Sequence, residues 1–145
     1  MKQQSERLQP ICDFKKRQEE DAAKKLAEAT QALAQQKQRL VELEGYRAEY
    51  CQQFTEIGGK GISAQKLREY QGFMTKLNTV VDQQKMAIEK LSQDHEQTKR
   101  QWLAARNRSK ALNNVQSKYH EREQQLEEKK LQKEQDDRSN RRLTL

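Results

Sequence analysis

The stretch Gly58-Gly59-Lys60-Gly61-Ile62-Ser63 holds three of the five glycines in a chain of 145 residues that has a single proline. Glycine tolerates the left-handed backbone that ends a helix, and serine is a preferred residue at a helix N-cap. The stretch therefore predicts one turn, at residues 58–63, between two long helices. Because so short a connection brings consecutive helices side by side, the two helices must run antiparallel.

A seven-residue period lies on both sides of this turn. The first helix has its predicted seam at Leu26, Leu33, Leu40, Arg47 and Phe54 (position a) and at Ala22, Ala29, Gln36, Leu43, Tyr50 and Ile57 (position d). The second has Leu67, Met74, Val81, Ile88, His95, Trp102 and Ser109 at a, with Tyr70, Leu77, Gln84, Leu91, Thr98, Ala105, Leu112, Tyr119 and Leu126 at d. A period kept over this length is typical of a left-handed coiled coil.

Antiparallel packing places residues whose numbers sum to about 124 opposite one another. The predicted pairs are Ile57 with Leu67, Phe54 with Tyr70, Tyr50 with Met74, Leu43 with Val81, Leu33 with Leu91 and Ala22 with Trp102. The last pair sets a small residue against the largest one, as interdigitated packing requires. The polar seam residues Arg47, Gln36, Gln84, His95 and Thr98 are expected to fix this register and to stay partly hydrated.

The predicted fold is all-α, a single coiled-coil domain over residues 1–145 in which two long helices form an antiparallel hairpin. Pro10 fits a first helical turn, so the first helix is expected at about 9–57 and the second at about 64–134, with a frayed tail at 135–145. In this arrangement the second helix has no partner after about Val115. Its residues Leu112, Tyr119 and Leu126 would then form an exposed apolar stripe.

The composition argues against an enzyme. With 35% charged and 32% hydrophobic residues, the chain has too little apolar material for a globular core with a substrate cavity. Neither His95 nor His120 has ligand residues at suitable spacing, and no phosphate-binding loop occurs, so we expect no catalytic residue, metal or cofactor. No apolar run predicts a membrane span or a secretion signal, and Cys12 and Cys51 are too far apart to pair, which favours the cytoplasm.

The net charge of +7 comes mostly from one segment, Gln97 to His120, which contains six basic residues and no acid. These six residues are Lys99, Arg100, Arg106, Arg108, Lys110 and Lys118. Such a segment suits an acidic protein surface, and it also leaves open a basic coiled coil that binds nucleic acid. Since Trp102 is assigned to the seam, the first alternative is favoured. A generic scaffold that self-associates is a further alternative.

The two flanks of the predicted seam differ. The e positions carry Lys37, Glu44 and Cys51 on the first helix and Gln71, Asn78 and Lys85 on the second. The g positions carry Tyr46 on the first helix and Phe73, Val80 and Ala87 on the second, beside Leu43, Leu77 and Tyr50. Large apolar side chains on one flank predict a protein-binding strip. The alternative is that they only widen the contact between the helices.

Three motifs follow one another along the chain. They are Tyr46-x-x-x-Tyr50, then Gly61-Ile62-Ser63 with Leu67-x-x-Tyr70-Gln71-x-Phe73, then Trp102-x-x-Ala105-x-x-Arg108-x-Lys110-Ala111-Leu112. In order and spacing these motifs resemble the flagellar export protein family FliJ. The similarity spans about residues 10 to 138. The chain departs from the family pattern after Leu112, where Asn113-Asn114-Val115 replaces a charged run, and again at Gln135-Asp136-Asp137.

The resemblance implies a non-enzymatic stalk of the flagellar type III export apparatus, with a coiled coil similar to that of the rotary ATPase γ subunit. The implied partners are a hexameric export ATPase, an export-gate membrane protein at the cytoplasmic face of the inner membrane, and export chaperones. Transferred to this sequence, the gate contact falls on Phe73, Leu77, Val80 and Gln84, and the chaperone contact on Leu43, Tyr46 and Tyr50. The basic residues Lys99 to Lys118 lie toward the end that would approach the ATPase ring. The corresponding stalk of a virulence secretion system is the alternative.

Overall fold

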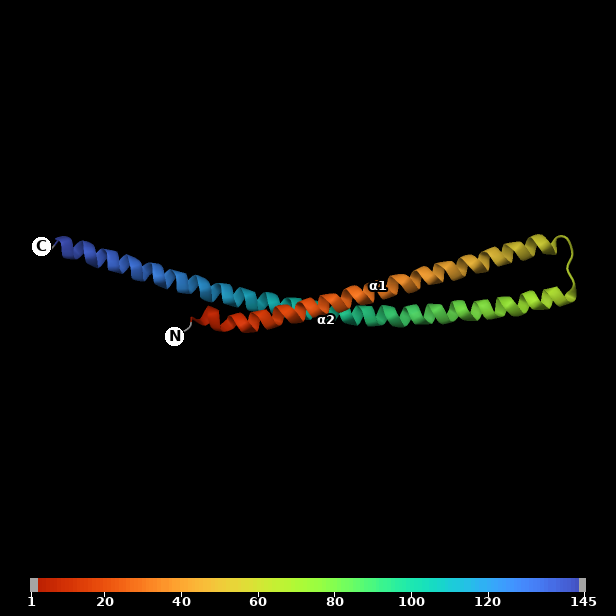
Figure 1. The fold of residues 1–145 in the computed structure, drawn as a ribbon, viewed down its shortest axis with the longest axis horizontal. Coiled ribbons are helices and arrows are strands. Elements are labelled where there is room, and N and C mark those ends of the chain that lie inside the picture. Colours follow the sequence, from red (N-terminus) through yellow and green to blue (C-terminus); the bar gives the residue numbers. More distant parts are fainter. Residues whose placement is uncertain (1–2, 144–145) are drawn as a thin grey trace. The chain divides into compact units, whose positions relative to one another are not determined.

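The computed structural model describes residues 3–143 and consists of two long helices joined by one short turn (Figure 1). Helix α1 spans Gln4–Gly58 and helix α2 spans Ala64–Leu143, and no strand occurs among the described residues. The two helices pack against each other as an antiparallel hairpin, which confirms the predicted all-α class. None of the described helical segments is apolar enough over a sufficient length to cross a membrane.

The turn contains the predicted serine cap and a left-handed glycine, but this glycine lies three residues after Gly58, the last residue of α1, and not at the helix end where it was expected. Gly61 has a φ of 85°, the left-handed region that a residue with a Cβ rarely adopts. The amide of Gly59 donates to the carbonyl of Thr55, which closes the end of α1. At the start of α2, the amide of Lys66 donates to Ser63 Oγ at 3.2 Å, so Ser63 caps the helix.

The chain divides into two compact units, and both helices contribute to each. The terminal unit contains Met1–Ala23 and Gln101–Leu145, and the turn unit contains Lys24–Arg100. The prediction that the chain behaves as one domain remains a prediction.

Interhelical contacts in the turn unit confirm the predicted register. Gln84 Nε2 donates to the backbone oxygen of Gln36 at 3.0 Å and to its Oε1 at 2.8 Å. The rings of Phe54 and Tyr70 are stacked with their centroids 3.5 Å apart. The residue numbers in these two pairs sum to 120 and 124. The helices therefore meet where the heptad positions place them.

The core of the turn unit is narrow and consists of the predicted seam. Val81 is fully buried and Leu33 nearly so, while most of the remaining seam residues are half-buried because each helix has only one neighbour. The predicted pair Ile57 and Leu67 is an exception, since both side chains are exposed. They form the last layer before the turn, where no further layer covers them.

The terminal unit corrects the predicted start of the first helix. Helix α1 begins at Gln4 rather than near residue 9, so Pro10 lies inside the helix. Ser5 is held by α2, because its backbone amide and its Oγ both donate to the Glu123 carboxylate, at 3.0 and 2.5 Å. Gln116 Nε2 also donates to the carbonyl oxygen of Ser5 at 3.0 Å. The bond from the Ser5 amide satisfies a first-turn N–H group that an isolated helix end would leave to water.

This earlier start also corrects the expected unpaired stretch after Val115. Because α1 extends to Gln4, the seam continues to Glu123, and Leu112 and Tyr119 are half-buried against it. Ser109, at a predicted a position, is buried, and so is Cys12, which lies two heptads before Leu26. Of the expected apolar stripe only Leu126 is exposed, at 67% of its surface. The predicted partner of Trp102, Ala22, is likewise half-buried, although their direct contact remains a prediction.

The tail differs from its prediction as well. Helix α2 continues to Leu143, so the expected loss of helix over residues 135–143 is wrong, and residues 144–145 lie outside the described part. Without a heptad period, residues 135–143 have no apolar seam with which to pair. They can still form a helix, because no glycine or proline occurs there. Arg141 and Arg142 in the last turn also favour the negative end of the helix dipole.

The hydrogen bonds that Ser5 donates to the Glu123 carboxylate lower the pKa of that group. A carboxyl group whose pKa is lower in the folded state than in the unfolded chain stabilises the fold at neutral pH. This stabilisation is lost as the pH falls through the folded-state pKa. The contact between the start of α1 and α2 is therefore strongest with Glu123 ionised.

Replacing Val81, the largest fully buried side chain among residues 3–143, tests the seam. We expect Val81→Ala to lower the free energy of unfolding by about 1–3 kcal/mol, because it removes buried methyl groups and leaves a cavity. The matched control is Val41→Ala, at a valine that is 62% exposed, with an expected change within about 0.5 kcal/mol. Urea unfolding followed by circular dichroism measures both, and equal effects would contradict the register.

Candidate protein-docking surfaces

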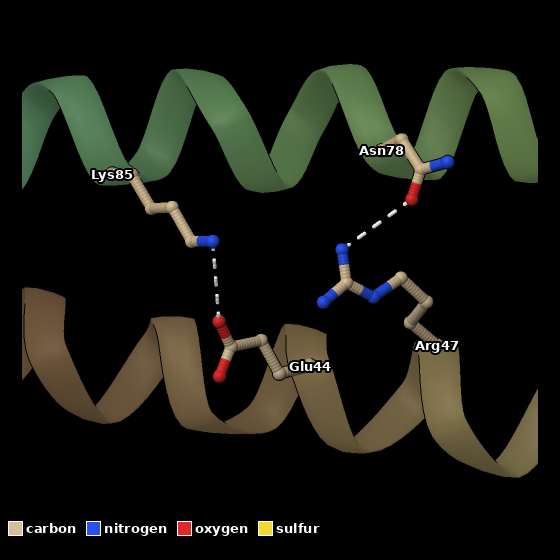
Figure 2. Close-up of polar contacts among 4 residues, drawn as sticks. All are labelled: Glu44, Arg47, Asn78 and Lys85. Carbon is tan, nitrogen blue, oxygen red and sulfur yellow. Dashed lines mark hydrogen bonds and ion pairs between the residues drawn. The ribbon is translucent and has the colours of Figure 1, made fainter.

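One flank of the turn unit is closed by polar contacts between the helices. Figure 2 shows two of them: Lys85 Nζ lies 3.8 Å from a Glu44 carboxylate oxygen, and Arg47 Nη1 donates to Asn78 Oδ1 at 3.4 Å. Each contact is exposed and contributes little to stability. Three of these four residues are at e positions, and Arg47 reaches this flank from the seam. The e flank therefore offers a polar surface whose side chains already contact one another.

One of the two histidines, His95, has its hydrogen-bonding partner on the same flank. His95 Nε2 lies 2.9 Å from Thr30 Oγ1, across the seam, which gives this half-buried ring a hydrogen-bonding partner. Among the described residues no group of three or more His, Cys, Asp or Glu side chains is placed to hold a metal ion. Four of the five polar seam residues, Gln36, Arg47, Gln84 and His95, thus make hydrogen bonds between the helices, whereas the Thr98 hydroxyl donates to Asp94 within α2.

The opposite, g flank of the turn unit exposes apolar side chains. Tyr46 on α1 is 65% exposed, and Phe73 and Val80 on α2 are 46% and 42% exposed. We call these three residues, with the exposed Ala87, the apolar strip. The contact between the two helices leaves about half of the surface of these side chains exposed to solvent. The structure therefore agrees with a strip that is open to a partner rather than one that only widens the seam.

A cluster of aromatic rings in the seam packs against the apolar strip at the end near the turn. The Tyr50 ring lies 4.4 Å from the Phe73 ring and 5.3 Å from the Tyr70 ring, measured between centroids. Tyr70 in turn stacks on Phe54. Hydrogen bonding with the Cys51 side chain and burial raise the pKa of Tyr70. Because Phe73 rests on Tyr50, its orientation on the surface is set by the seam.

The seven residues expected at the gate and chaperone contacts divide into two groups. Tyr46, Phe73 and Val80 are exposed and belong to the apolar strip. Leu43, Tyr50, Leu77 and Gln84 are half-buried in the seam beside it. The side-chain amide nitrogen of Gln84 is already used in its bonds to Gln36. The exposed group can meet a partner, and the seam group holds it in place.

The six basic residues expected at the ATPase contact do not share one face of α2. All six are exposed. By heptad position, Lys99 and Arg106 lie on the e flank, Arg108 and Lys118 on the g side, and Arg100 and Lys110 on the outer face. Lys99 and Arg100 belong to the turn unit, and the other four to the terminal unit. The charge is therefore spread around the helix.

The structure exposes further apolar residues in the terminal unit that the sequence analysis missed. Ile11 and Phe14 on α1 and Val115 on α2 are exposed. They were missed because the seam of this region, with Ser5, Cys12, Glu19 and Ser109 at a, is too polar to reveal its heptads by apolar residues alone. Extending the heptad count from Leu26 back to Ser5 would have placed Ile11 at a g position.

Comparison with known proteins assigns the family. The family model described as "Flagellar FliJ protein" matches residues 3–144, nearly the whole chain. The chain belongs to the FliJ family. No curated protein sequence and no solved structure matches it significantly. The protein is thus related to flagellar export, in a family of structural and escort proteins rather than enzymes.

The aromatic cluster and the apolar strip can be separated by substitution. Tyr50→Ala should lower the free energy of unfolding by about 1–3 kcal/mol, because it removes a half-buried ring that contacts two others. Tyr46→Ala should change it by less than about 0.5 kcal/mol, since that ring is mostly exposed. Thermal and urea unfolding measure the difference. Equal losses would place Tyr46 in the core and remove it from the strip.

Proposed function

We propose that this protein is a coiled-coil stalk of the flagellar export apparatus that acts by docking and carries out no bond chemistry. In this proposal it engages the hexameric export ATPase, contacts the export-gate membrane protein and escorts export chaperones. It works in the cytoplasm, at the inner face of the membrane, through these protein partners. Family membership supports the flagellar export role, and the description of that family favours it over a virulence secretion system.

The observation that carries the docking role is the one-sided exposure of apolar side chains in the turn unit. Tyr46, Phe73 and Val80 are exposed on the g flank, whereas the e flank is occupied by polar contacts. Partly exposed aromatic side chains supported by a rigid base are typical anchors of protein interfaces. We assign Phe73 and Val80 to the gate contact, supported by Leu77 and Gln84. We assign Tyr46 to the chaperone contact, supported by Leu43 and Tyr50.

The proposed contact with the ATPase uses the basic residues of α2. Because Lys99, Arg100, Arg106, Arg108, Lys110 and Lys118 point in several directions around the helix, they suit a partner that surrounds it. A ring of subunits is such a partner. A stalk inside a ring acts only by touching some subunits more favourably than others, which shifts their conformational populations. The same spread of charge gives no continuous basic face for a nucleic-acid groove.

Phe73 tests the apolar strip. Phe73→Asp should weaken binding of the purified cytoplasmic domain of the export gate by roughly tenfold or more, because it places a charge at an apolar contact. Helicity should be unchanged, since Phe73 is half exposed and contributes one ring contact to the fold. Met86→Asp is the control, at a residue that is 71% exposed on the outer face of α2. Pull-down with circular dichroism tests both variants, and unchanged gate binding in folded Phe73→Asp protein would refute the assignment.

The ATPase contact is tested by charge reversal. Replacing Arg106, Arg108 and Lys110 together by Glu should weaken ATPase binding and flatten its dependence on salt, since it turns attraction into repulsion. The control reverses Lys60, Lys66 and Arg68, three exposed cations near the turn, with the same change in net charge. Sedimentation with the ATPase at two salt concentrations measures both. If the first variant binds and stimulates the ATPase normally, the ring contact lies elsewhere.

A further inference from the structure

The terminal unit exposes a second apolar group, separate from the apolar strip. Ile11 and Phe14 on α1 are 47% and 55% exposed, and Val115 on α2 is 43% exposed. Ile11 and Val115 both occupy g positions and lie opposite each other in the register, since Gln9 and Gln116 are hydrogen-bonded across the same seam. Phe14, one turn after Ile11, occupies the adjacent c position. The three side chains therefore belong to one flank of the terminal unit.

Cations surround this apolar group. Arg7 lies one turn before Ile11 on α1, and Arg108, Lys118 and Arg122 lie at g and c positions of α2, all exposed. We call these seven residues the basic apolar patch: Arg7, Ile11, Phe14, Arg108, Val115, Lys118 and Arg122. Two of them, Arg108 and Lys118, belong to the proposed ATPase contact.

Few acidic side chains lie on this flank. In the first part of α1, Glu6, Asp13 and Glu20 occupy b positions, on the other side of the helix, and Glu19 occupies an a position in the seam. The α2 helix has no acid between Gln97 and His120, and the Glu123 carboxylate that follows accepts hydrogen bonds from Ser5. A partner that approaches this flank therefore meets mainly positive charge around an apolar centre.

The patch also contains a hollow. A depression of about 150 Å³ on α2 is lined by Val115, Lys118, Tyr119 and Arg122. Its floor is apolar, because Tyr119 is half-buried in the seam and Val115 stands beside it. Its rim carries two cations. Such a site suits a bulky apolar side chain that is followed or preceded by carboxylates.

We propose that the basic apolar patch binds an acidic amphipathic segment of a protein partner. An apolar side chain of that segment occupies the hollow beside Val115, and its carboxylates pair with Arg108, Lys118 and Arg122. The inference rests on the proposed docking function and deepens it, since it states the chemistry that the partner must present. It adds an apolar anchor to a contact that charge alone had suggested.

Charge selects this occupant over a second copy of the chain. In a two-fold dimer built on this patch, the same surface would face itself, so its four cations would meet four cations. The remaining competitor is an anionic membrane surface, which also attracts exposed cations and apolar side chains. The hollow favours a protein segment, because it holds one side chain at a fixed position relative to the cations. The experiment includes both competitors.

The probe is a labelled helical peptide of about 18 residues with leucine on one face and glutamate on its flanks. Fluorescence anisotropy with the full chain should show binding that is roughly tenfold tighter than for two matched peptides, one with alanine for leucine and one with lysine for glutamate. Val115→Asp should weaken binding of the acidic peptide by roughly tenfold, and so should the double change of Lys118 and Arg122 to Glu. Val41→Asp, at an exposed valine in the turn unit, should leave it unchanged.

Several outcomes would overturn the proposal. Equal binding of the alanine peptide would mean that charge alone acts, and equal binding by folded Val115→Asp protein would mean that the hollow is not used. Vesicles of phosphatidylglycerol that bind the chain and displace the peptide would assign the patch to a membrane. If sedimentation equilibrium shows a dimer and Val115→Asp makes the chain monomeric, the patch binds a second copy of the chain.

The same variants separate this inference from the proposed ATPase contact. If Val115→Asp loses the peptide but binds the ATPase normally, the patch takes an acidic segment and its assignment to the ring is wrong. If reversal of Arg106, Arg108 and Lys110 abolishes ATPase binding while no acidic peptide binds, the ring contact stands and the inference is overturned. The first result would refute the ATPase contact at the patch, and the second would refute the binding of an acidic segment.

Discussion

The structure depends on a single seam in which alternate third and fourth residues of α1 and α2 cover one another. Each helix has one neighbour, so only a few side chains, such as Val81, Leu33 and Cys12, are buried well. Hydrophobic stabilisation scales with apolar area removed from water, and here that area is small for the length of chain. The seam therefore needs its register to be fixed by specific contacts, such as those of Gln36 with Gln84 and of Ser5 with Glu123.

A two-helix seam leaves two flanks, and this chain uses them differently. Polar residues such as Glu44, Lys85 and Asn78 meet across the e flank of the turn unit. The g flanks expose apolar side chains in both units, Tyr46 and Phe73 in one and Ile11 in the other. Two packed helices offer little concave surface, so recognition depends mainly on such a difference between flanks. Membership in a family of export proteins gives this asymmetry a use.

How much the sequence predicts depends on how apolar the seam is. The turn at Gly61 and Ser63 and the register near Phe54 and Tyr70 were predictable, because large apolar residues repeat there without interruption. The first helical turns were not, because Pro10 reads as a helix start and the preceding a position is a serine. The helical tail was predicted to be frayed for a related reason. The lack of a heptad period shows only that a segment has no seam to pack against, and such a segment can still be helical. The partner assignments within the strip rest on family resemblance, which the fold alone does not supply.

Helix α2 is longer than α1, and its last part extends beyond the start of α1. Gln4, at the start of α1, lines a common depression with Leu126, Glu127 and Lys130 of α2, so α1 reaches about as far as Lys130. The 13 described residues beyond Lys130 are all exposed, and they span about 20 Å at 1.5 Å per residue. An isolated helix of this size is only marginally stable in water. Its melting is therefore uncoupled from that of the paired region. A protein that binds this extension would therefore stabilise its helix without changing the seam between α1 and α2.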